Sequence, residues 1–170
     1  MKKILFFAII TLLFFTSCKD EKLSFLDITS LHFPINTLTI TQGLTLDDTL
    51  APGKPPVAPW DPPATPHPSK YYQRIINESP WVASGFYGAS VEGARPLKVT
   101  LESVKTKGDN ANADILKKDL KIIGEGRMLV PFATKLPIGE YILSLKISNM
   151  HGSKVVNDVF TIVVTDEKKL

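Results

Sequence analysis

The stretch that decides the fold is residues 139–149, which read GEYILSLKISN. Large apolar side chains recur there at every second position, with isoleucine, serine and lysine between them. The apolar set is Tyr141, Leu143, Leu145 and Ile147. A period of two places all four on one face of a strand, so the stretch predicts a half-buried β-strand.

A second strand follows after a short turn. Residues 149–152 read NMHG, a composition typical of turns, and residues 155–165 read VVNDVFTIVVT. The apolar residues expected to lie inward are Val156, Phe160, Ile162 and Val164. Asp158 interrupts this pattern, and we expect it at a strand edge. The two strands together predict a β-hairpin that closes the domain.

Shorter strands are predicted upstream of this hairpin. Residues 97–104 alternate apolar and polar side chains, and residues 36–41 do so with β-branched types. Residues 120–123 and 128–132 flank GEGR at 124–127, a composition suited to a hairpin turn. Many short strands with turns between them, and no long helical periodicity, predict an all-β sandwich.

Residues 51–68 read APGKPPVAPWDPPATPHP and contain eight prolines. Proline lacks the amide proton and fixes φ, so this segment predicts an extended, semi-rigid arm with polyproline-II character. It either separates two modules or leaves and re-enters a single fold. Roughly 30 residues precede it, too few for an independent core, which favours the excursion from one fold.

The N-terminus reads as a secretory leader. Lys2 and Lys3 precede an apolar run over residues 4–15, and the small residues Thr16 and Ser17 follow. The run is shorter than the roughly 20 apolar residues that span a bilayer. Residues 1–17 are therefore predicted to be a signal peptide that is removed and takes no part in the fold.

Cys18 is the single cysteine of the chain, so no internal disulfide is possible. Thr16-Ser17-Cys18 resembles a bacterial lipobox, although Phe15 departs from the usual aliphatic residue. The resemblance implies acyl chains of the palmitate type on Cys18 and a membrane anchor, followed by a polar tether over residues 18–24. The alternative is an ordinary secretory signal in which Cys18 is incidental.

Residues 19–22 read KDEK and resemble the signal that sends Bacteroidetes-type lipoproteins to the outer face of the outer membrane. The resemblance implies an outer-membrane, cell-surface protein. A merely solvated tether is the alternative.

Residues 136–149, followed by Gly152 and a last strand, resemble the final hairpin of bacterial immunoglobulin-like domains of the cadherin and fibronectin types. The resemblance implies an immunoglobulin-like antiparallel β-sandwich over residues 25–168. It also implies that Tyr141 lies at a corner, where its hydroxyl binds backbone. The turn lacks the clustered acids of a cadherin calcium site, so calcium is not implied.

Several functional classes lack support in the sequence. The leader carries two of the 20 basic residues against 17 acidic ones, so the mature chain is nearly neutral and gives no case for nucleic acid. His32, His67 and His151 lack the spacing of a zinc site. A Gly-x-Ser-x-Gly elbow and a phosphate-binding glycine loop are missing too. We therefore expect a protein without metal or cofactor that is not an enzyme.

Aromatic residues are enriched between positions 60 and 87, where both tryptophans lie. Flat aromatic faces on loops can stack on sugar rings or anchor a protein partner. The predicted ligand-binding residues are Trp60, Tyr71, Tyr72, Trp81 and Tyr87. The alternative is that the aromatic residues pack beneath the arm as a satellite core.

Two functional hypotheses follow. The first is a cell-surface binding lipoprotein that recognises carbohydrate by aromatic stacking, as an accessory of polysaccharide uptake. The second is a structural or assembly component of an envelope complex that docks a protein partner through residues 51–68. Both assign the membrane as a partner through Cys18.

Overall fold

The computed structural model describes residues 26–51, 53, 66–86, 91–93, 95–108 and 111–166. The predicted signal peptide, Cys18, the tether and residues 54–65 of the arm lie outside the described residues. The chain is mostly β, with 50% strand and 13% helix arranged around several small antiparallel sheets. The prediction of a fold made mostly of β-strands is therefore confirmed.

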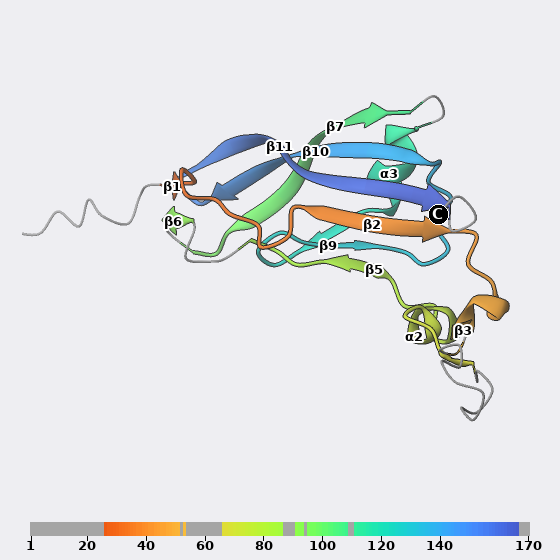
Figure 1. The fold of residues 1–170 in the computed structure, drawn as a ribbon. Coiled ribbons are helices and arrows are strands. Elements are labelled where there is room, and N and C mark those ends of the chain that lie inside the picture. The colour runs from red at the N-terminus through yellow and green to blue at the C-terminus, as the bar shows by residue number, and fades with distance from the viewer. Residues whose placement is uncertain are drawn as a thin grey trace, which may run out of the picture.

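The larger sheet has four strands in the order β2-β11-β10-β7 (Figure 1). They are β2 (Thr37–Gln42), β7 (Lys98–Lys107), β10 (Gly139–Asn149) and β11 (Gly152–Asp166). β10 runs antiparallel to both neighbours, so the predicted closing hairpin is confirmed. β2 instead pairs parallel to β11, which makes this sheet mixed where a purely antiparallel one was predicted.

The smaller sheet has three antiparallel strands in the order β5-β9-β8. They are β5 (Trp81–Ala83), β8 (Lys121–Ile123) and β9 (Arg127–Val130). The turn between β8 and β9 contains Gly124 and Gly126, both with positive φ angles of 52° and 79°. Glycine adopts these angles without a steric penalty, which explains why the predicted hairpin forms there.

The inner faces of the two sheets form one core. The four-stranded sheet contributes Ile40, Tyr141, Leu143, Leu145, Ile147, Phe160, Ile162 and Val164. The three-stranded sheet contributes Trp81, Ala83, Met128 and Val130. The short helix α3 (Ala113–Asp119) adds buried Leu116 to this core, and its N-cap Asn112 accepts a hydrogen bond from the Asp114 amide. The alternating residues of β10 thus face the core as predicted.

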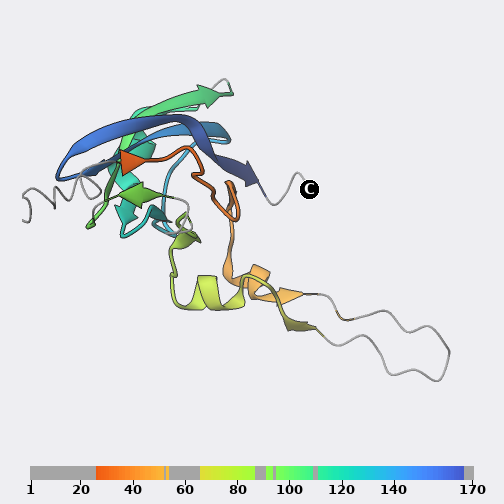
Figure 2. The same cartoon turned by 90° about the vertical axis from the view of Figure 1, so that its left-hand side faces the viewer.

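Small elements complete the fold. At one end β1 (Leu26–Asp27) pairs with β6 (Glu92–Gly93). The elements at the other end are η2 (Leu46–Thr49), β3 (Leu50–Ala51), β4 (His67–Pro68) and α2 (Tyr72–Ile76) (Figure 2). We call these four elements the arm base. Ala51 pairs with His67, so residues 51–68 leave and re-enter the structure at adjacent points.

A β-bulge interrupts the long hairpin. Leu143 pairs with Phe160 but Leu145 pairs with Val156, so β11 has extra residues around Asp158, whose φ is 53°. The sequence prediction that Asp158 marks a strand edge is wrong, because β11 continues on both sides of it. The break in the apolar alternation at Asp158 therefore corresponds to the bulge, and β10 and β11 remain paired on both sides of it.

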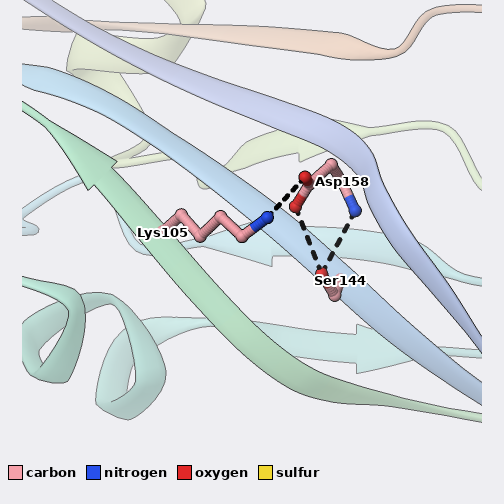
Figure 3. Close-up of polar contacts among 3 residues, drawn as sticks. All are labelled: Lys105, Ser144 and Asp158. Carbon is pink, nitrogen blue, oxygen red and sulfur yellow. Dashed lines mark hydrogen bonds and ion pairs between the residues drawn. The ribbon is translucent and has the colours of Figure 1, made fainter.

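Figure 3 shows the polar contacts that hold this bulge. Ser144 is buried, and its hydroxyl oxygen accepts a hydrogen bond from the Asp158 amide at 3.1 Å. The Asp158 carboxylate in turn pairs with the Lys105 amine at 2.6 Å. Three strands of the larger sheet therefore meet through side chains at one point.

Candidate functional site

Two of the aromatic residues singled out in the sequence, Tyr71 and Trp81, meet where the arm base adjoins β5. Trp81 lies on the inward face of β5 and is only 5% exposed. The Arg74 guanidinium carbon lies 4.1 Å from the centroid of the Trp81 ring. The same guanidinium donates to the backbone oxygen of Ser79 at 3.1 Å and to that of Pro80. Arg74 thus covers a tryptophan face that would otherwise meet solvent.

Tyr71 completes this cluster. Its ring meets Trp81 edge to face, with centroids 6.5 Å apart and planes at 64°. Its hydroxyl shares a 3.2 Å hydrogen bond with the Thr41 hydroxyl on β2. Edge-to-face pairs and a satisfied hydroxyl are typical of packed aromatic residues. For Tyr71 and Trp81, the satellite-core alternative describes what the structure contains.

The cluster joins the arm base to the body of the fold. Within the arm base, the Ser69 amide donates to the Thr49 carbonyl at 2.8 Å, and the Ser69 hydroxyl donates to the Asp48 carbonyl. These bonds tie α2 and β4 to η2. Tyr71 and Arg74 then fasten α2 to β2 and β5, so the arm base has a fixed position relative to the sheets.

The Arg74 guanidinium carries the positive charge that faces the Trp81 ring. Burial lowers its pKa below the usual value, and the neighbouring Tyr71 acts in the opposite direction. Arginine starts from so high a pKa that it stays protonated at neutral pH. The positive charge that faces the Trp81 ring is therefore permanent.

The predicted site residues divide into three groups. Trp81 is buried and Tyr71 and Tyr72 are half-buried. Trp60, Tyr87 and the lipid-attachment residue Cys18 lie outside the described residues. The structure therefore brings Tyr71 and Trp81 together and leaves their rings engaged with protein.

The sequence reading missed two features of the arm base. Arg74 is one, because its contact with Trp81 depends on how α2 turns back on β5 and no spacing encodes it. The other is a set of exposed aliphatic side chains: Leu46 is 72% exposed, Leu50 55% and Ile76 51%. The segment LDDTL over residues 46–50 was a signal for it, since its two leucines flank acids in a segment too short to bury them.

Metal sites and membrane-spanning helices are the other functional features to consider in the described ranges. Among these residues, no group of three or more His, Cys, Asp or Glu side chains is placed to hold a metal ion. No helix within the same ranges is long and apolar enough to cross a membrane. Comparison of the chain with protein-family models, curated proteins and solved structures gave no match.

Proposed function

We propose that this chain is a non-catalytic, lipid-anchored binding module built on an immunoglobulin-like β-sandwich. The strand orders β2-β11-β10-β7 and β5-β9-β8 support this fold, since such sandwiches pack a sheet of this kind against a second, smaller one. The Tyr141 hydroxyl donates to the Pro137 carbonyl at 2.8 Å, four residues upstream. This is the contact expected of a tyrosine corner at the start of the penultimate strand.

The anchor belongs to the same proposal. Acyl chains on Cys18 would hold the mature chain at the outer membrane, facing the cell surface. β1 is the first described element after Cys18, and it lies at the opposite end of the molecule from α2 and β3 (Figure 1). An anchor on Cys18 therefore favours presentation of the arm base away from the bilayer.

The role that the geometry supports best is docking of a protein partner by the arm base. The observation that carries it is the exposure of Leu46, Leu50 and Ile76 on elements that are fastened to the body. Aliphatic side chains suit an apolar protein surface and offer no flat ring to a sugar. Fixed elements lose little entropy on binding, and a proline-rich arm adds a further low-entropy segment.

Glycan binding is the second candidate, in a narrower form than the sequence predicted. Trp81 is buried, so its face is not available for stacking. Trp60, Tyr72 and Tyr87 are then the residues through which this role would act. Tyr72 is half-buried on α2, the helix that also carries exposed Ile76, so both candidates involve the arm base.

The test is capture of envelope proteins on intact cells by the full chain, followed by identification of the captured species. One variant combines Leu46→Ser, Leu50→Ser and Ile76→Ser. The matched control combines Ile123→Ser and Val155→Ser, which are also exposed but lie away from the arm base. We expect one species to be lost with the first variant and kept with the control.

A second measurement separates the two candidates. Soluble glycans are titrated against the full chain while its tryptophan fluorescence is followed. Quenching that disappears in Tyr72→Ala, with capture unchanged by the triple serine variant, would replace the protein-docking role with the glycan role. Capture of a second copy of this chain alone would point to self-association instead.

A further inference from the structure

A polar hollow lies on the outer face of the larger sheet, at the end where β1 begins. β7 and β10 supply its floor, and the turn between β10 and β11 supplies its wall. Its lining residues are Lys98, Thr100, Lys146, Ser148, Asn149, Met150, His151, Gly152 and Ser153.

Strand register explains why two amines meet there. Lys98 pairs with Ser148, and Thr100 pairs with Lys146, in the antiparallel ladder of β7 and β10. Their neighbours Val99 and Ile147 are buried in the core. Since successive side chains point to opposite faces, Lys98 and Lys146 extend from the solvent face.

The turn between β10 and β11, beside these lysines, is held by side-chain hydrogen bonds and has an exposed apolar residue at its tip. The Asn149 carboxamide oxygen accepts from the amides of His151 and Gly152, at 2.9 and 3.0 Å. Met150 is 80% exposed at this tip. A basic face beside an exposed apolar side chain is the composition of a surface that docks on an anionic membrane interface.

The lining of the hollow is basic, because it contains Lys98 and Lys146 and no acidic residue. Hydrogen bonds from the Thr29 hydroxyl and amide lower the pKa of Asp27, and the charge of Lys154 adds to this lowering. The positive charge of Lys154 is thus balanced by the carboxylate of Asp27. Glu92 is the cross-strand partner of Asp27 in the ribbon of β1 and β6. Within the described part of the chain, Lys98 and Lys146 form no ion pair.

We propose that this hollow, with Met150, docks on the anionic headgroups of the membrane that holds Cys18. The inference rests on the proposed anchor. Residues 18–25 reach about 28 Å at most when fully extended, so the end of the molecule bearing β1 stays near the bilayer. Attraction between exposed charges extends over about 8 Å in physiological salt, and the tether is long enough to let the hollow come that close to the bilayer. Docking at this hollow fixes the orientation of the long axis of the molecule relative to the bilayer. It directs the arm base away from the membrane.

The experiment is amine footprinting of the protein extracted from its membrane in its natural processed form. It is reconstituted on vesicles of phosphatidylcholine, or on vesicles in which about a third of the lipid is phosphatidylglycerol. A water-soluble acylating reagent is added, and the modification rate of each lysine is read by mass spectrometry. Lys118 and Lys135, both exposed and outside the hollow, are controls in the same sample.

We expect Lys98 and Lys146 to react about five-fold more slowly on anionic than on neutral vesicles, since each lysine near such a surface strengthens binding by roughly that factor. Lys118 and Lys135 keep their rates, and about 0.5 M salt abolishes the difference. Lys154 directly follows Ser153 of the hollow, so it should also be slowed on anionic vesicles in the parent chain. In a variant with Lys98→Gln and Lys146→Gln, Lys154 should react equally on both vesicles. A variant with Lys118→Gln and Lys135→Gln keeps the slowing at the hollow.

Equal rates for Lys98 on both vesicles would overturn the docking proposal. So would equal slowing by inorganic phosphate with neutral vesicles, which would mark a site for small anions. Sedimentation with neutral vesicles reports the anchor separately. If the protein fails to sediment with them yet Lys98 and Lys146 are still slowed on anionic vesicles, the anchor on Cys18 is wrong and the headgroup contact stands.

Discussion

The Tyr141 hydroxyl donates a hydrogen bond to the carbonyl oxygen of Pro137, and the amide of Asn112 donates to the same hydroxyl oxygen at 3.3 Å. One buried phenol thereby joins the start of β10 to the N-cap of α3. Both backbone groups would need other partners if the hydroxyl were removed. Tyr141 is therefore a structural link between the larger sheet and the segment that leads into α3.

Tyr141→Phe removes this link while leaving the ring in place. We expect the free energy of unfolding to fall by about 1–3 kcal/mol, because two part-buried hydrogen bonds, each worth about 0.5–1.5 kcal/mol, are lost. Urea denaturation followed by circular dichroism measures the change. Tyr72→Phe is the matched control and should lie within about 0.5 kcal/mol of the parent chain. Equal stability of Tyr141→Phe and the parent would contradict the assignment.

The Tyr141 phenol also makes the free energy of unfolding depend on pH in the alkaline range. Burial raises the pKa of Tyr141, and the hydrogen bond from Asn112 opposes the shift. The unfolded state then loses this proton at lower pH than the folded state does. The contribution is fully present below pH about 10 and is lost as the pH rises through the folded-state pKa. Chemical denaturation between pH 9 and 12 should show a shallower decline in Tyr141→Phe than in the parent.

Regular alternation explains what the sequence could predict. In β10, Tyr141, Leu143, Leu145 and Ile147 follow a strict period of two, and the core confirms their shared face. Asp158 shows the limit of this reasoning. Alternation assumes one residue opposite one residue, and a bulge violates that assumption. The interruption at Asp158 marks the position, but it does not distinguish a bulge from a strand edge.

The candidate site was less accessible from sequence for a similar reason. Enrichment in aromatic residues located the region of Tyr71 and Trp81 but could not say whether their faces meet solvent. That depends on Arg74 and on how α2 returns toward β5, both long-range outcomes of folding. Burial of Trp81 converts a predicted stacking platform into part of the core.

The bulge at Asp158 gives a prediction about backbone conformation. Asp158→Asn loses the exposed ion pair with Lys105, but asparagine tolerates a positive φ. We therefore expect this variant to lose less than about 1 kcal/mol of the free energy of unfolding. Asp158→Val places a β-branched residue at φ 53° and also loses the carboxylate. We expect it to cost about 2–3 kcal/mol. Similar stabilities for these two variants in urea would show that backbone conformation does not dominate at this position.

Arg74 gives the prediction that bears most directly on the arm base. Arg74→Met keeps a long side chain but removes the cation over the Trp81 ring and both hydrogen bonds to backbone oxygens. We expect a loss of about 1–3 kcal/mol from these contacts together. Arg74→Lys keeps the charge without the planar guanidinium, so it should fall between the parent and Arg74→Met.

Local hydrogen exchange locates this effect. The amides of Ile75 and Asn77 bond to the carbonyls of Tyr71 and Gln73, at 2.9 and 3.2 Å within α2. In Arg74→Met these amides should exchange faster, because α2 loses its attachment to β5. The amides of β10 should keep their protection, because the pairing of the larger sheet does not depend on Arg74. Lys70→Met removes another cation over an aromatic ring, 4.7 Å from the Tyr71 centroid, and is the control. If Lys70→Met accelerates exchange in α2 as much as Arg74→Met does, the attachment does not depend on the guanidinium. The exposed aliphatic set would then be positioned by Tyr71 and Ser69 alone.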